Sequence, residues 1–420
     1  MKASLIKECV HSFKKELFQL AQELVRFPSI TGEETPAQRY LAKRWQDWGL
    51  GIDLWIPEAE DVAGHSAFCD DGLPIERVNV VAQWGEGDPK RAALILNGHI
   101  DVVPVGDRSQ WNDDPFDGSI YKNTLYGRGS CDMKGGLAAM SYAVRVAQEL
   151  GVTPERPILL QSVIGGETGG LGTLAAIVRG YRADAAVIAE PTSLTMSPVA
   201  SGALSFRLRV TGRSTHGALP GSGVSALEKF WKVWKALREL ESKRHLGFQH
   251  RAFADNPLAA PISIGKLHAG EWPSTLPDEA LAEGRFGIFP GEEPLAARQV
   301  LEDMLRGISE GDDWLRDHPV QLEWFEGQFE PGETDASAPI LDQLAAAHRD
   351  ITGQELISHG VPYGCDLRLL TRYANTPTVL YGPGDVLNAH TANEHVALDE
   401  IVTATEVLAM LIVSVAEGVT

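Results

Sequence analysis

Several short apolar runs of this 420-residue chain end just before a side chain that can bind a metal ion or carry a proton. Four such runs, rich in Val, Ile, Leu and Ala, occupy residues 92–96, 158–164, 185–188 and 378–381. The side chains that follow them are, in the same order, His99, Glu167, Glu190 and His390. Ligands of open α/β sheets bind in the crevice beyond the carboxyl ends of the strands, so we expect these side chains to converge.

A fifth candidate, Asp132, lies in the Gly-rich loop 127–136, which leads into a helical pattern. Such a loop is also typical of a simple turn or a phosphate cradle. It lacks the Gly-Lys-Ser/Thr ending of a P-loop, so nucleotide binding is not favoured. Taken singly, each of the five side chains has an ordinary explanation, such as a surface polar pair or a helix cap. Together, two imidazoles and three carboxylates make two N/O sites that share one carboxylate, which suits paired zinc ions.

These residues stand in short motifs whose order and approximate spacing resemble those of the M20 metallopeptidase and deacylase family. The motifs are His99-Ile100-Asp101, the loop 131–136, Glu167-Thr168-Gly169-Gly170, Glu190-Pro191-Thr192 and Ala389-His390-Thr391. The nearest branch is that of acetylornithine deacetylase and succinyl-diaminopimelate desuccinylase. The resemblance implies an α/β, mixed-sheet zinc-hydrolase catalytic domain with an inserted ferredoxin-like domain that serves as lid and dimerisation domain.

The resemblance also implies how the metal ions are held. Asp132 would bridge two zinc ions. His99 and Glu190 would complete one site, and Glu167 and His390 the other. Cobalt or manganese would accept similar nitrogen and oxygen ligands.

Two further roles follow from the same resemblance. Asp101 would accept the far N–H of His99 and fix the tautomer of that imidazole. His216, in the inserted domain, would stabilise the tetrahedral oxyanion, commonly across a dimer interface. The simpler interpretation of His216 is an exposed loop histidine.

One position departs from the family pattern. The family has two successive glutamates before the Gly-Gly pair, the first a general base and the second a metal ligand, but here the pair reads Gly166-Glu167. Removal of a general base typically costs about 10²–10⁴-fold in rate. Three interpretations remain open: an engineered or accidental substitution in an otherwise active enzyme, a natural variant with another acid or base, or a chain without hydrolytic activity. On the first, Gly166→Glu is expected to raise amide hydrolysis by orders of magnitude.

Substrate recognition is the second departure. Family members often hold the substrate's carboxylate with an Asn and a strand Arg of the inserted domain. Here Ser274 or Thr275 would replace the amide, and Gly287 stands where the Arg would be. Arg285, two residues earlier on the same strand face, is either a substitute or a solvated strand charge.

A loop around Asp366 and Arg368 resembles a family loop near the active site. Either side chain would then contact the substrate. Capping of the following helix by Asp366 is the simpler account.

The elements that must position these residues are those of an α/β protein. Continuous apolar runs suit strands buried on both faces, and helical patterns at 136–150 and 172–179 lie between them. Between residues 201 and 327 the order becomes β-α-β-β-α-β, the split βαβ unit. We therefore predict a catalytic domain over 1–200 and 329–420, with a lid and dimerisation domain over 201–328.

Composition excludes other classes of protein. The 57 acidic residues exceed the 37 Lys and Arg by a net charge of -20, which repels nucleic acid and anionic membrane surfaces. The four cysteines are far apart and form no CxxC pair, as expected of free thiols in a reducing compartment. No signal peptide is evident, and the apolar stretch 407–416 is shorter than the roughly 20 residues of a membrane span. We expect a cytoplasmic protein that binds neither nucleic acid nor membranes.

The sequence thus predicts a metal-dependent hydrolase of the amide bond in small N-acyl amino acids or related amines, using water activated by two zinc ions. An exopeptidase or dipeptidase of the same family would need the same metals and differ only in its pocket. The alternative from another class is a catalytically silent, metal-holding form, which Gly166 motivates. The resemblance implies a homodimer whose substrate is a small acylated amino acid or a dipeptide.

Overall fold

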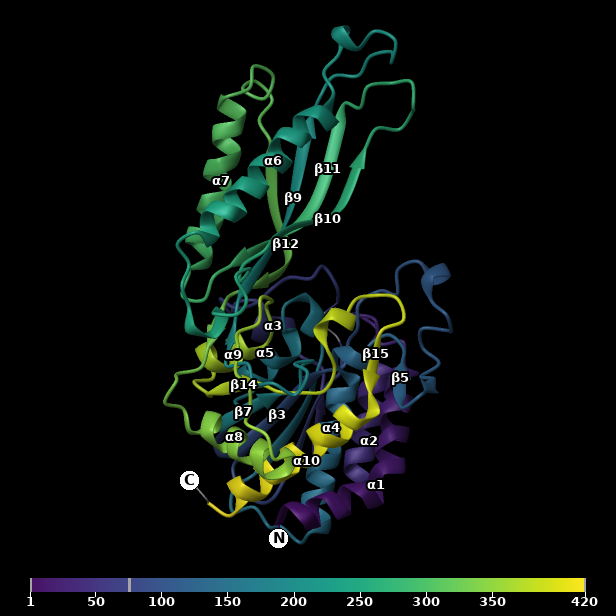
Figure 1. Ribbon diagram of the computed structural model, residues 1–420, viewed down its shortest axis with the longest axis vertical. Coiled ribbons are helices and arrows are strands. Elements are labelled where there is room, and N and C mark those ends of the chain that lie inside the picture. Colours follow the sequence, from purple (N-terminus) through teal and green to yellow (C-terminus); the bar gives the residue numbers. More distant parts are fainter. Residues whose placement is uncertain (1, 75–76, 419–420) are drawn as a thin grey trace. The chain divides into compact units, whose positions relative to one another are not determined.

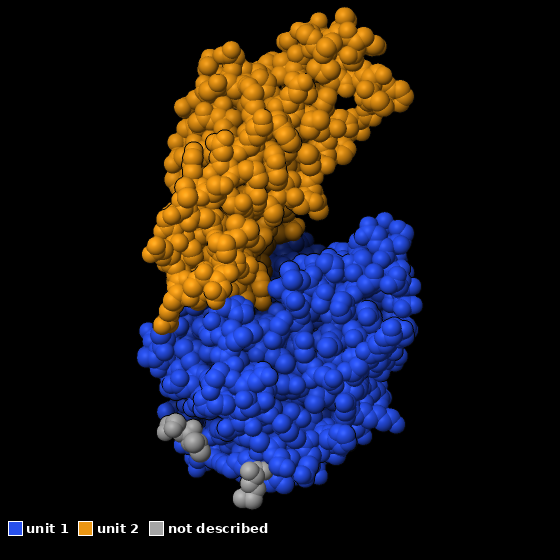
Figure 2. All heavy atoms as spheres, in the orientation of Figure 1, with its two compact units in different colours: residues 1–199, 333–359, 365–420 blue, residues 200–332, 360–364 orange. Residues whose placement is uncertain are grey.

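The computed structural model describes residues 2–74 and 77–418, which divide into two compact units (Figures 1 and 2). Unit 1 comprises residues 1–199, 333–359 and 365–420, and unit 2 comprises residues 200–332 and 360–364. The second unit therefore runs four residues beyond the predicted boundary at 328 and also takes in residues 360–364, which we had placed in the catalytic domain.

Unit 1 is built on a six-stranded mixed sheet (Figure 1). In spatial order its strands are β1 (Gly51–Trp55), β2 (Asn79–Trp84), β6 (Ile158–Val163), β3 (Ala92–His99), β7 (Ala183–Ile188) and β14 (Thr378–Leu380). The last four run parallel to one another, whereas β1 and β2 join the sheet antiparallel. The predicted α/β fold with a mixed sheet is confirmed.

Helices cover the sheet so that every residue of β3 and β6 is buried. The helices of unit 1 are α1 (Lys2–Val25), α2 (Thr35–Asp47), α3 (Ala59–Val62), α4 (Gly135–Glu149), α5 (Leu171–Val178), α8 (Pro339–Thr352), α9 (Leu367–Tyr373) and α10 (Leu398–Ala416). Among them α1, α4, α8 and α10 pack together, and α5 packs against α9. Within the described residues, no helix is both long and apolar enough to cross a membrane.

A small sheet lies beside the start of α4 in unit 1. It consists of β15 (His395–Ala397), β5 (Thr124–Tyr126) and β4 (Ile120–Tyr121), all antiparallel. It joins the chain after residue 390 to the chain before residue 130, so two predicted ligand loops lie side by side.

Unit 2 has the predicted β-α-β-β-α-β order. The elements are β9 (Gly202–Thr211), α6 (Ala226–His245), β10 (Ile262–Ala269), β11 (Glu279–Ile288), α7 (Pro294–Glu310) and β12 (Gln321–Phe329). The antiparallel sheet has the order β10-β11-β9-β12. Its core is apolar and includes Phe206, Phe230 and Leu301. The predicted ferredoxin-like domain is confirmed.

Candidate metal centre

His99 is the last residue of β3, and each of its two ring nitrogens lies close to an oxygen atom. Its Nδ1 lies 2.9 Å from the backbone carbonyl of Asp101, an acceptor that places the ring proton on Nδ1. The Nε2 atom then faces Asp132 Oδ1 at 3.1 Å and Glu190 Oε1 at 4.0 Å. The ring is buried, and the hydrogen bond from Nδ1 holds its orientation.

Asp132 lies between two imidazoles that come from distant parts of the chain. It belongs to the segment Ser130–Lys134, just before α4, and its backbone is non-helical, with φ −119° and ψ 93°. Its Oδ1 faces His99, whereas its Oδ2 lies 3.4 Å from Nε2 of His390. One carboxylate therefore presents its two oxygens to two different imidazoles.

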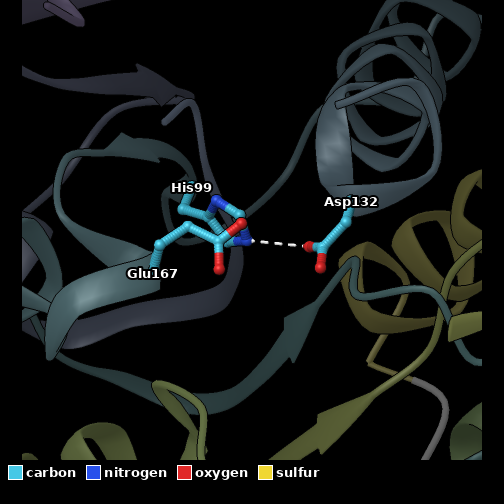
Figure 3. Close-up of side chains that lie close together, drawn as sticks. All are labelled: His99, Asp132 and Glu167. Carbon is cyan, nitrogen blue, oxygen red and sulfur yellow. Dashed lines mark hydrogen bonds and ion pairs between the residues drawn. The ribbon is translucent and has the colours of Figure 1, made fainter. Parts of the chain in front are cut away.

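Glu167 and His390 form the second half of the cluster. Glu167 Oε2 lies 3.2 Å from His390 Nε2. The other oxygen of Glu167, Oε1, is buried and has no hydrogen-bond partner among the described residues. Single ligand atoms of His99, Asp132 and Glu167 lie within 4.8 Å of one another, which is a spacing suited to a metal ion (Figure 3). An unpartnered buried carboxylate oxygen beside such a group fits a metal ligand.

The charges in this cluster are strongly coupled. Burial, together with the charge of Asp132, raises the pKa of Glu190 to about 8. The charge of Glu167 raises the pKa of His390 to about 11. Burial alone would raise the pKa of Asp132, but hydrogen bonds with His390 and His99 hold it well below its usual range. Carboxylates and imidazoles thus compete for protons in this cluster, and divalent cations would take the place of those protons.

From the sequence we expected the carboxylate of Asp101 to accept the N–H of the His99 ring, but it does not. Its Oδ1 lies 3.6 Å from Nδ1, whereas the backbone carbonyl of the same residue takes that contact at 2.9 Å. The carboxylate instead accepts the backbone N–H of Gly166 at 2.9 Å and of Glu167 at 3.1 Å, and the hydroxyl of Thr31 at 3.0 Å. Asp101 therefore supports one ligand with its backbone and another with its side chain.

Gly166 has no room for a side chain in this arrangement. A Cβ added there would lie 2.4 Å from Cβ and 2.5 Å from Cγ of His99. The His99 ring is held by the end of β3 and cannot swing away cheaply. The prediction that Gly166→Glu restores a base therefore meets a steric obstacle, because the new side chain would displace His99, a predicted metal ligand.

The candidate residues of unit 2 are partly brought together. His216 is exposed and forms an antiparallel bridge with Thr275, and the carbonyl of Ser274 accepts the N–H of Gly217. Arg285 lies on β11, where it donates to the carbonyl of Pro362 at 2.8 Å.

Burial lowers the pKa of Arg285 to about 10, and no carboxylate in the described residues forms an ion pair with it. Position 287 has no room for the arginine that the family carries there, because a Cβ at this position would lie 2.4 Å from the backbone of Ala260. Arg285 is thus the positively charged residue of β11 that could bind an anion.

Asp366 and Arg368 are buried. Asp366 accepts the hydroxyl of Thr173 at 2.6 Å, and its side chain makes no capping hydrogen bond to α9, contrary to the simpler prediction. Arg368 donates to the carbonyl of Gly169 at 2.9 Å, in the turn that carries Glu167. Arg368 therefore supports the turn of Glu167, and Asp366 holds Thr173 on α5.

Two residues that the sequence interpretation missed hold the loop of Asp132. Glu394 accepts the backbone N–H groups of Cys131 and Asp132, and Arg128 forms a buried ion pair with Glu394. In the sequence, Arg128 comes four residues before Asp132 and Glu394 four residues after His390. This spacing does not reveal that the two side chains pair with each other or that Glu394 binds the backbone at Asp132.

The chain is similar to known proteins over most of its length. Residues 95–414 match the family described as Peptidase family M20/M25/M40. An N-formyl-4-amino-5-aminomethyl-2-methylpyrimidine deformylase of Halalkalibacterium halodurans is 28% identical, over 97% of this chain and 96% of its own. An acetylornithine deacetylase of Myxococcus xanthus is 29% identical, over 83% of this chain and 88% of its own. The crystal structure of human carnosine dipeptidase 1 is 16% identical, with a TM-score of 0.77 over 99% of both chains, which is a likeness of fold alone.

Proposed function

Because the chain belongs to the peptidase family M20/M25/M40, we propose that it is a two-zinc amidohydrolase that removes a small acyl group from an amine. The observation that carries the proposal is the position of Asp132, whose two oxygens face the imidazoles of His99 and His390. A carboxylate shared in this way is the donor that two neighbouring cations require.

The donor set fits zinc. His99 and Glu190 would hold one ion and Glu167 and His390 the other, with Asp132 common to both. Imidazole nitrogen and carboxylate oxygen are ordinary zinc ligands, although cobalt or manganese would also accept them. When bound, the ions would supply a Lewis acid for the amide carbonyl and a lowered pKa for water.

The chain's own residues prepare this site. The carbonyl of Asp101 orients His99 so that Nε2 points into the cluster, and its carboxylate fixes the turn that carries Glu167. With glycine at position 166, proton transfer must use a carboxylate other than the family's base. A metal-holding protein without turnover is the alternative that Gly166 favours.

The relatives guide the choice of acyl group. The deformylase aligns with nearly the whole chain, whereas the acetylornithine deacetylase aligns with a smaller share of it. We therefore place formyl and acetyl amides ahead of dipeptides. Arg285 in unit 2 is our candidate for binding a carboxylate on the amine, and His216 is our candidate for stabilising the oxyanion.

Unit 2 also offers a surface for a second copy of the chain. Leu227 and Trp231, one turn apart on α6, are 45% and 56% exposed. Two large apolar side chains side by side on one helix face are typical of an association surface. We propose that the protein is a cytoplasmic homodimer joined through this face.

Metal analysis combined with a substrate panel tests the proposed function. The purified protein should bind two zinc ions per chain and lose activity after chelation. The panel should hold N-formyl and N-acetyl derivatives of the same amine and a dipeptide of similar size. Turnover of the acyl amides supports the deacylase, and turnover of the dipeptide alone supports the exopeptidase. Zinc binding without any metal-dependent product would support the silent form and refute the hydrolase.

A further inference from the structure

The buried side chain of Glu394 accepts hydrogen bonds from the backbone at Asp132. Glu394 Oε1 accepts the N–H of Cys131 at 3.1 Å and the N–H of Asp132 at 3.0 Å. Its Oε2 lies 2.5 Å from Nη1 of Arg128, and both side chains of this ion pair are almost completely buried. The carboxylate is thus used on both oxygens, with no access to solvent.

The two N–H groups need this acceptor. The backbone at Asp132 is non-helical, so the chain before α4 does not satisfy its donors by regular helical hydrogen bonds. A buried N–H group without a hydrogen-bond partner destabilises the conformation that buries it. Loss of the Glu394 carboxylate would therefore favour another conformation of the loop, and with it another direction for the side chain of Asp132.

Arg128 also forms hydrogen bonds with the loop that carries His390. Its Nη1 also donates to the carbonyl of Thr391 at 3.3 Å, and its Nη2 donates to the carbonyl of Pro104 at 3.3 Å. Thr391 follows His390 directly, and the carbonyl of Glu394 accepts the N–H of Gly127 at 2.9 Å. The Glu394–Arg128 pair therefore ties the loop of Asp132 to the loop of His390.

We propose, on the basis of the proposed two-metal function, that Glu394 is a positioning residue which, with Arg128, holds Asp132 between the two metal sites. Glu394 itself touches neither metal nor substrate. It acts through the backbone of residues 131 and 132. Since Asp132 belongs to both sites, a change in its direction weakens both, and the effect differs from loss of a ligand to one site.

Two double variants separate positioning from general stabilisation. In Glu394→Gln/Arg128→Gln, the new amide at 394 retains an oxygen for the two N–H groups and a partner at position 128. In Glu394→Met/Arg128→Met, the buried charges are replaced by apolar side chains, which is often neutral for stability, but the acceptor is lost. We measure zinc affinity by chelator competition, the absorption spectrum of the cobalt form, and thermal unfolding of the metal-free proteins.

The Met pair is expected to bind zinc about 10–100-fold more weakly than the wild type, because disruption of such outer contacts has that effect on metal sites. Its cobalt spectrum should change, and the Gln pair should retain most of the affinity. Asp312→Asn, which removes a buried carboxylate charge paired with Lys229 in unit 2, serves as control and should leave zinc affinity unchanged. Wild-type affinity in the Met pair, or equal losses in both pairs, would overturn the inference. A wild-type protein that binds no zinc would instead refute the proposed function.

Discussion

The carboxylate of Asp101 accepts the backbone N–H of Gly166 at 2.9 Å, across 65 residues of sequence. The same carboxylate takes the N–H of Glu167, so the turn after β6 is fixed against the chain that follows β3. The α-carbon of Gly166 is thereby pressed against the ring of His99, where a Cβ would lie 2.4 Å from that of the histidine. Glycine at this position is a requirement of the packing around a predicted metal ligand.

Substitution of Gly166 should therefore weaken metal binding. We expect Gly166→Ala and Gly166→Glu to displace His99 and to reduce turnover, since a misplacement of about 1 Å near a reacting centre can cost about 10²-fold. Zinc affinity and turnover are measured together. Gly307→Ala, at an open helical position of unit 2, is the control and should not change either. A large gain of turnover in Gly166→Glu would show that the chain does lack only a base.

Asp101→Asn should disturb Glu167 more than His99. The backbone carbonyl that holds His99 remains, but the amide nitrogen of asparagine cannot accept an N–H, so one of the two contacts to residues 166 and 167 is lost. We expect zinc affinity to fall about 10–100-fold, as for other outer contacts of metal sites. Thr31→Val, which removes a neutral hydroxyl from the same carboxylate, should have a smaller effect. Equal effects of the two variants would contradict this order.

The stability of unit 2 should depend on the charge of Asp312. Burial would raise the pKa of this carboxyl, but hydrogen bonds from Lys229 and Lys232 and from backbone N–H groups hold it well below its usual range. The pKa of this carboxyl in the unfolded chain is about 3.9, and its pKa in the folded protein is lower. The ionised carboxylate therefore stabilises the folded state above about pH 3.9, and this stabilisation is lost as the pH falls toward the folded pKa. Asp312→Asn should therefore destabilise unit 2 at pH 7 by about 2 kcal/mol, the usual worth of hydrogen bonds to a charged group. Denaturant unfolding at pH 7 and near pH 3 checks this, and a difference that stays constant with pH would argue against it.

Association through α6 is tested by Trp231→Glu. The indole is 56% exposed and lies one turn from Leu227, so a charge there would face the partner in the proposed dimer. Sedimentation velocity should show a dimer for the wild type and a monomer for the variant. Trp272→Glu changes another exposed indole of unit 2 that lies outside the helix, and it should leave the dimer intact. A monomeric wild type would exclude the proposed interface.

The ends of the central strands were predictable from the sequence, and the supports around them were not. A parallel strand buried on both faces is a continuous apolar run, so His99 could be placed at the end of β3 and Glu190 just after β7. The edge strand β1 was missed, because its pattern alternates between half-buried and exposed and carries no such run. Asp101 and Glu394 act on backbone N–H groups of distant turns, and a sequence does not show which turn a carboxylate will meet. The tight contact between Gly166 and His99 was hidden for the same reason.

Arg285 should decide between substrates with and without a carboxylate. Its guanidinium has a single backbone acceptor at 2.8 Å and no ion-pair partner in the described residues, so it can receive an anion without breaking an existing pair. Arg285→Gln should raise KM about 10–100-fold for an acylated amino acid. This is the effect expected from loss of one hydrogen bond to a charged group, which contributes about 1.5–3 kcal/mol. The KM for an acylated amine without a carboxylate should not change. Arg207→Gln is the matched control, because Arg207 is already paired with Glu283 at 2.7 Å and Glu323 at 2.9 Å on the same sheet. If Arg285→Gln affects both substrates alike, the arginine supports the strand β11 and does not select the substrate.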